Sequence, residues 1–241
     1  MKKLVLFSVV LVSLQSFSQT VDDVIGKYIT AMGGLEKIHS LKSLYIEQVA
    51  VMQNGNEVNS KIWKVQDKLM RREINFGMGS ATMIVTDKAG WASNPRSGGN
   101  FEPMNPEVLK AQQTELECVS PLVDYAAKGS KAELQGEEDV DGKKCYKVKL
   151  TTAGAREITY FIDETTYYID RTSMKGGMGR RPGADPNAET KIDYSDYRKT
   201  PEGFVFPYTT TIVGMGASSN IEKIEVNPTL DLAKLSTPSN S

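Results

Sequence analysis

Histidine and cysteine are scarce in this chain, which has one histidine and two cysteines among 241 residues. His39, Cys118 and Cys145 lack the close spacing that zinc ligands show. A serine, histidine and aspartate system would have to use His39, and the chain has no G-x-S-x-G sequence. We therefore expect no metal site, no cofactor and a structural role for His39. The two cysteines either form a disulfide or stay as buried thiols, and the sequence leaves both possibilities open.

Neither sign of charge is in excess, because 29 basic residues face 30 acidic ones. A nucleic-acid interface needs clustered basic residues, so we expect no nucleic-acid partner. Long apolar runs are missing beyond the N-terminal region, and no later segment looks like a membrane-spanning helix.

The N-terminal region has the pattern of a secretory signal peptide. Lys2 and Lys3 precede an apolar run from Leu4 to Leu14, and the small residues Ser16 and Ser18 follow it. The run is too short to span a bilayer, which needs roughly 20 residues as a helix. We expect residues 1–18 to be a signal peptide and residues 19–241 to form a single domain, exported to the periplasm and soluble after cleavage.

Two local sequences resemble known site motifs but lack essential residues. The stretch "GGMGRRPG" has no lysine-serine pair of the phosphate-binding loop type. Glu137, Asp139, Asp141 and Gly142 resemble a calcium loop, but its twelfth position is Val148 instead of a carboxylate. Carboxylate pairs for glycoside chemistry stay open, because sequence gives no distances. Positive evidence for an enzyme is absent, and we predict that the chain is not one.

Four segments have helical patterns. Apolar residues three and four apart predict a helix over 21–32, with Thr20 as its cap. A shorter helical turn is expected over 35–40. Asparagine or serine followed by proline predicts helix starts for 106–116 and 120–129.

The rest of the chain has the two-residue alternation of β-strands, separated by turn residues. Short connections make consecutive strands antiparallel neighbours. About eleven strands are expected, in the segments 43–53, 57–66, 69–78, 80–87, 132–150 (two strands), 156–163, 167–174, 190–200, 204–215 and 218–227. The predicted fold class is α+β: a strongly curved antiparallel sheet with a few helices that cover its concave face incompletely and leave an apolar cavity.

Several stretches resemble the superfamily of periplasmic lipoprotein carriers of the LolA and LolB type. The first are "KIWKVQDKLMRREI" and "MIVTDKAGWASNP", which resemble a pair of strands in that superfamily. The others resemble an exported subgroup found in Bacteroidetes-type bacteria: "SPLVDYAAKG", "GEEDVDGKKCYKVKL", "TYFIDETTYYIDR" and "YSDYRKTPEGFVFPYTTTI". The resemblance covers essentially the whole chain after the signal peptide.

The resemblance implies a half-barrel that holds lipid or lipoprotein acyl chains under a helical lid, with a role in outer-membrane lipoprotein sorting. It also implies envelope membrane proteins as donor or acceptor. One residue departs from the pattern: carriers of this type have an arginine three residues after the strand tryptophan, and here Gln66 follows Trp63 at that distance. In those carriers the arginine holds the lid through polar contacts. The glutamine at this position in the present chain predicts a lid that is held less firmly, or a different ligand.

The tripeptide Gly-Met-Gly occurs three times, at 77–79, 177–179 and 214–216, each at a predicted strand end or in a loop. Methionine adapts to irregular apolar partners, and flanking glycines free the backbone, so these positions would form a pliable rim. Simple core packing is the alternative for apolar residues at a two-residue period. The candidate lipid-binding residues are Trp63, Met70, Ile74, Phe76, Met78, Met83, Tyr160, Ile162 and Tyr208.

Two functions are consistent with these sequence features. The first is a periplasmic carrier or binding protein that holds lipid or lipoprotein acyl chains in an apolar half-barrel cavity. The alternative is a non-enzymatic interaction or sensor module of the cell envelope, without lipid cargo, whose 175–189 loop meets a partner.

Overall fold

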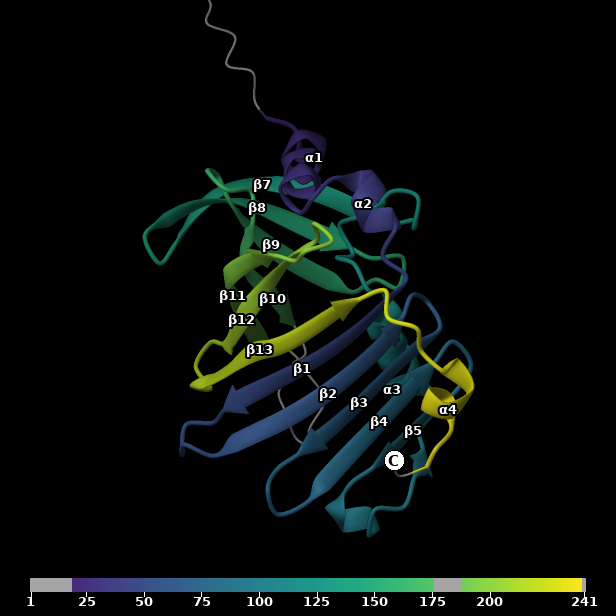
Figure 1. Cartoon of the computed structure of the whole chain (residues 1–241). Helices are drawn as coiled ribbons and strands as arrows, with labels where there is room; N and C mark the ends of the chain where they lie inside the picture. Colours follow the sequence, from purple (N-terminus) through teal and green to yellow (C-terminus); the bar gives the residue numbers. More distant parts are fainter. Residues whose placement is uncertain (1–18, 176–187, 240–241) are drawn as a thin grey trace, which may run out of the picture.

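The computed structural model describes residues 19–175 and 188–239, so the signal peptide and the Gly-Met-Gly at 177–179 lie outside the described residues. All strands belong to one antiparallel sheet of 13 strands, in the order β6-β5-β4-β3-β2-β1-β13-β12-β11-β10-β9-β8-β7 (Figure 1). The order consists of two meanders, β1 to β6 and β7 to β13, which join where β1 pairs with β13.

The first meander contains β1 (Ser43–Val51), β2 (Glu57–Val65), β3 (Leu69–Asn75), β4 (Ser80–Thr86), β5 (Gly90–Ser93) and β6 (Glu102–Pro103). The second contains β7 (Lys131–Val140), β8 (Lys143–Thr151), β9 (Glu157–Asp163), β10 (Ile169–Lys175), β11 (Glu189–Lys199), β12 (Val205–Ile212) and β13 (Ala217–Val226). The α+β class and the antiparallel order are confirmed, but the predicted strand count is too low by two. The missed strands are β5 and β6, which are too short to show an alternating pattern.

The helices are α1 (Val21–Ala31), α2 (Leu35–His39), α3 (Pro106–Gln112) and α4 (Leu232–Ser236), with 3-10 turns η1 (Pro95–Ser97) and η2 (Gln113–Leu116). Thr20 caps α1 through its hydroxyl, which accepts a hydrogen bond from the backbone N–H of Asp23. None of the described helices is long and apolar enough to cross a membrane.

The helix predicted over 120–129 is wrong. This segment forms a series of turns, in which Asp124 has a φ of 53°, the left-handed region that a right-handed helix excludes. Leu122 and Val123, at the start of the segment, are 0 % and 1 % exposed. Tertiary packing of these two side chains therefore outweighs the proline start and glycine end that favour a helix.

The sheet bends toward residues 116–122. Leu116 packs with Met70 of β3 and Val85 of β4, whereas Leu122 packs with Val148 and Leu150 of β8. In a flat sheet β3 and β8 would lie about 38 Å apart at the usual strand spacing, but a segment of this length extends at most about 21 Å. Only a curved sheet brings both clusters within reach, so the face that carries Met70 is concave. We call it the inner face, and the opposite one the outer face.

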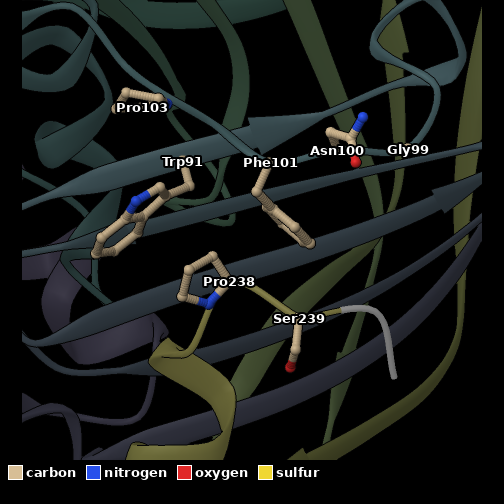
Figure 2. Close-up of a pocket in the computed structure, with 7 residues that line it drawn as sticks. All are labelled: Trp91, Gly99, Asn100, Phe101, Pro103, Pro238 and Ser239. Atoms are coloured by element: carbon tan, nitrogen blue, oxygen red, sulfur yellow. The ribbon is translucent and has the colours of Figure 1, made fainter.

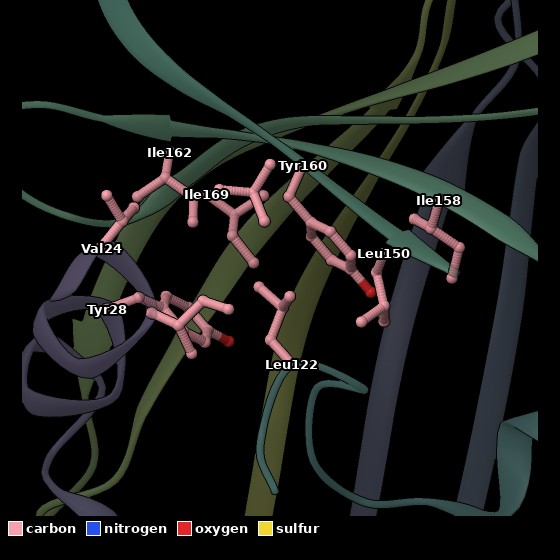
Figure 3. Packing of buried hydrophobic residues seen from close by; sticks show 10 residues of the cluster. Val24, Tyr28, Leu122, Leu150, Ile158, Tyr160, Ile162 and Ile169 are labelled. Atoms are coloured by element: carbon pink, nitrogen blue, oxygen red, sulfur yellow. The ribbon is translucent and has the colours of Figure 1, made fainter. Parts of the chain in front are cut away.

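Helices lie on both faces. On the inner face, Val24 and Tyr28 of α1 pack with Leu122 against Tyr160 and Ile162 of β9 (Figure 3). α3 and η2 cover the inner face of β3 and β4. α4 contacts β3 and β4 from the outer face and lies in front of them in Figure 1.

Candidate functional site

The inner face is apolar, and its middle part is incompletely covered. Strand pairing places Met70, Leu44 and Val85 on this face, where they are buried. Toward the middle of the sheet the inner apolar side chains are only half-buried. These are Ile46, Ile74, Met83, Phe206, Ile212, Ile221 and Ile224.

The segment made of α3, η2 and residues 117–125 packs on the inner face. We call this segment the cover. The backbone N–H of Cys118 donates to Oε1 of Gln66 (2.7 Å), and Nζ of Lys64 donates to the carbonyl of Glu117 (2.5 Å). From the far side of the sheet, Nη1 of Arg156 donates to the hydroxyl of Thr114 (2.9 Å). Gln66 therefore contacts the cover, although it stands where the resemblance leads one to expect an arginine.

An exposed apolar rim borders the same face. The turns β1–β2, β3–β4 and β12–β13 are neighbours at one edge of the sheet, because their strands follow each other in the sheet order. A Cβ atom on Gly216 would lie 2.5 Å from Cγ of Gln53, so two of these turns are in contact. The rim residues are Met52, Phe76, Met78, Val213 and Met215; the exposed Val51 alternates with Ala50 and lies on the outer face.

The prediction that Gly-Met-Gly lies at strand ends is confirmed for 77–79 and 214–216. Met78 is 101 % exposed and Met215 is 58 % exposed. Gly77 and Gly214 have φ values of 79° and 81°, a conformation that glycine adopts without strain. Met78 and Met215 therefore add exposed apolar surface to the rim.

Most of the candidate lipid-binding residues lie on the inner face or the rim. Met70 is buried beneath η2, whereas Met83 packs against the same cluster but stays half-buried, and Ile74 is half-buried two residues before the rim residue Phe76.

Tyr160 and Ile162 are buried beneath α1 and Leu122, so they form core in this structure (Figure 3). Burial raises the pKa of Tyr160, and raises the pKa of Tyr28 to about 12, so both hydroxyls stay protonated at neutral pH. Tyr208 is half-buried, with the guanidinium of Arg198 4.6 Å from its ring centroid.

Trp63 lies on the outer face and is a correction to the predicted set. It pairs with Arg71 across β3, whereas Met70 pairs with Lys64, and successive side chains of a strand point to opposite faces. Its ring packs on Tyr45 with a centroid distance of 5.2 Å. Trp63 therefore does not contribute to the inner surface.

Two pockets lie on the outer face. The first, of about 430 Å³, is lined by Trp91, Gly99, Asn100, Phe101, Pro103, Pro238 and Ser239 (Figure 2). The second, of about 340 Å³, is lined mainly by charged residues of the second meander. Both are open to solvent, so neither is the enclosed apolar cavity predicted from the sequence. The apolar surface of this molecule is a concave face with an open rim.

The residues considered for metal or nucleophilic chemistry do not converge. Cys118 packs with the inner cluster around Leu44, while Cys145 lies on the outer side of β8, and both are free thiols. Burial raises the pKa of Cys118 to about 11 and of Cys145 to about 12. His39 binds Asp124 through Nε2 and Oδ2 at 2.6 Å, a partner 85 residues away that sequence could not indicate. Within residues 19–175 and 188–239, no group of three metal-binding side chains occurs.

The sequence matches no protein-family model and no curated protein. Solved structures with a similar fold include a DUF1329 family protein from Desulfovibrio piger, with a TM-score of 0.59 and 13% identity over 90% of this chain and 98% of that chain. A LolA superfamily protein from Nitrosomonas europaea has a TM-score of 0.54 and 9% identity over 91% of this chain and 98% of that chain.

A third similar structure is a putative outer membrane lipoprotein-sorting protein domain from Vibrio parahaemolyticus. Its TM-score is 0.51, with 9% identity over 88% of this chain and 94% of that chain. At such low identities the likeness concerns the fold. The chain has the LolA-like fold that its sequence motifs indicate.

Proposed function

We propose that this protein is a periplasmic carrier that binds the acyl chains of a lipid or lipoprotein on its inner face. The observation that carries the proposal is that half-buried apolar side chains of the concave face, such as Ile74, are followed in the chain by exposed apolar side chains of the rim, such as Phe76 and Met78. An acyl chain buried there would remove apolar surface from water, which is the main driving force for binding such a ligand.

We assign different parts to the proposed binding residues. Ile74 and Met83 would contact the chain on the inner face, and Phe76, Met78 and Met215 would contact it at the rim. Tyr160 and Ile162 would support this surface from the core. Methionine side chains at the rim suit a ligand of variable length, because they change shape at low cost.

Native mass spectrometry of the protein exported to a Gram-negative periplasm tests this proposal. We expect the purified protein to retain lipid, seen as an added mass that organic extraction removes. Ile74→Lys should abolish this added mass, because it puts a charge on the inner face. Val49→Lys is the matched control, since Val49 is also a half-buried apolar strand residue but lies on the outer face.

Retention of the same lipid by the Ile74→Lys variant would refute binding at the inner face. Absence of lipid from the unaltered protein would favour the alternative, an envelope interaction module without cargo.

A further inference from the structure

Two cationic side chains lie close together on the apolar inner face. Lys64 of β2 pairs with Met70, and Arg72 of β3 pairs with Ile62 and, on its other side, with Met83. Lys64 and Arg72 are thus diagonal neighbours on one face, a position in which long side chains reach each other. Their apolar neighbours include Ile62, which is 5 % exposed.

Arg72 lacks a partner for its charge. Its Nε atom is buried without a hydrogen-bond partner, and among the described residues its guanidinium forms no ion pair. Burying a guanidinium is unfavourable unless an anion and hydrogen bonds compensate it. Burial accordingly lowers the pKa of Arg72, and the nearby Glu115 only partly opposes this.

The charge of Lys64 is also only partly compensated. Its Nζ binds the carbonyl of Glu117, but that residue's carboxylate is 2.7 Å from Nζ of Lys128. Burial also lowers the pKa of Lys64, and Glu115 again opposes the shift. Glu115 is exposed and lies within ion-pair distance of neither cation in the described part of the chain. The carboxylate of Glu117 also opposes the shift of Lys64 but is shared with Lys128, so the two inner cations are only partly compensated.

We propose that Lys64 and Arg72 bind the anionic head group, carboxylate or phosphate, of an acyl-chain amphiphile. This inference rests on the proposed carrier function and narrows its ligand to amphiphiles that bear a negative charge. The anionic oxygens would accept hydrogen bonds from Nε of Arg72 and from Nζ of Lys64.

The arrangement of β3 gives the direction of the bound chain. Ile74 follows Arg72 on the same face, about 6.7 Å further along the strand, and Phe76 and Met78 lie in the turn beyond the end of β3 at Asn75. Ile74 is half-buried, Phe76 is 46 % exposed and Met78 is 101 % exposed. The head group would therefore lie beneath the cover, and the acyl chain would run outward over Ile74 to the rim.

Calorimetric titration with four probes tests the proposal: dodecanoate, dodecyl phosphate, dodecanol and inorganic phosphate. We expect both charged amphiphiles to bind at least about tenfold more tightly than dodecanol, a ratio that one hydrogen bond to a charged group supplies. Inorganic phosphate alone should show no binding at millimolar concentration. Arg72→Gln should reduce the preference for dodecanoate over dodecanol, because only Lys64 remains as a cationic partner, and should leave the affinity for dodecanol unchanged.

Two further variants serve as controls. Arg72→Lys keeps the charge and should keep the preference for dodecanoate, which excludes a general folding defect as the cause. Arg96→Gln removes an exposed arginine outside the inner face and should change neither affinity.

The outcomes separate the two proposals. Equal binding of dodecanoate and dodecanol, or an Arg72→Gln variant that keeps the preference, would overturn the anion site and leave the carrier function standing. If inorganic phosphate bound as tightly as dodecyl phosphate, the acyl chain would add nothing to the affinity, and the proposal that the ligand is an amphiphile would be wrong. Failure of all three amphiphiles to bind would refute the carrier function itself.

Discussion

A buried arginine attaches the C-terminal segment to the sheet. Arg71 is 3 % exposed, and its Nε lies 2.8 Å from Oε1 of Glu73. Its Nη1 atom donates to the carbonyls of Leu235 and Thr237, each at 3.3 Å, and Nη2 donates to the carbonyl of Ser239 at 2.9 Å. The guanidinium thus holds α4 and the residues after it on the outer face of β3.

Arg71→Met should destabilise the protein by about 3 kcal/mol. Hydrogen bonds to a charged group contribute about 1.5–3 kcal/mol each, but two of the three carbonyl contacts are long and the contributions do not add fully. Methionine replaces part of the apolar stem, so little packing is lost. For a domain of this size, a loss of about 3 kcal/mol lowers Tm by roughly 6–12 °C.

Urea unfolding monitored by tryptophan fluorescence measures this loss of stability, because both tryptophans lie close to the attached segment. Trp63 pairs with Arg71, and Trp91 lines the pocket beside Pro238 and Ser239, so both tryptophans report on the attachment (Figure 2). Arg198→Met is the matched control, because Arg198 also pairs with an acidic residue two positions away, Asp196, but is exposed. The urea midpoint of the Arg198→Met variant should equal that of the unaltered protein. An unchanged midpoint for Arg71→Met would refute the role assigned to this contact.

Three further predictions concern packing, pH and the thiols. Leu122→Ala should cost about 3–5 kcal/mol in urea unfolding, because Leu122 is 0 % exposed between α1 and β8. Burial raises the pKa of Asp163, but hydrogen bonds that its carboxylate accepts, first from the backbone N–H of Thr166, outweigh this effect and hold the pKa below 3.8. The free energy of unfolding should therefore fall as the pH drops below about 4. Asp163→Asn should make this pH dependence flatter. Cys118 and Cys145 should react with a thiol reagent at pH 8 only after unfolding, because burial keeps both protonated.

Each of these predictions has a contrary result. A loss below about 1 kcal/mol for Leu122→Ala would mean that residues 116–125 do not join the core. If the Asp163→Asn variant lost as much stability in acid as the unaltered protein, the carboxylate of Asp163 would not be a source of the pH dependence. Rapid modification of the native thiols, or a mass that lacks two hydrogens, would contradict two buried free cysteines.

The alternation of side chains made the fold largely predictable from the sequence. Turn residues such as Asp141 and Gly142 have positive φ values in the structure and mark the hairpin between β7 and β8 as expected. The shortest strands and α4 were missed because a few residues carry no periodic signal. The segment 120–129 was misjudged because local helix signals say nothing about burial in a distant core.

The candidate site was predictable only in part, since a strand's inner and outer faces are set by its register. Met70, Ile74 and Met83 lie on the inner face, whereas Trp63 was chosen for its residue type and lies on the outer one. The sequence signal for Arg72 was available, because it stands between Met70 and Ile74 at a two-residue interval. What the sequence could not show is that Nε of this arginine is buried without a hydrogen-bond partner.

Photo-crosslinking locates a bound acyl chain on the protein without any substitution. The probe is a fatty acid that carries a diazirine in its acyl chain, and peptide mapping identifies the modified residues. Binding on the inner face predicts crosslinks at Ile74, Met83 and the rim residue Met78. Crosslinks concentrated at Trp91 and Phe101 in the outer pocket, with none on the inner face, would contradict a carrier that holds its ligand on the concave side of the sheet.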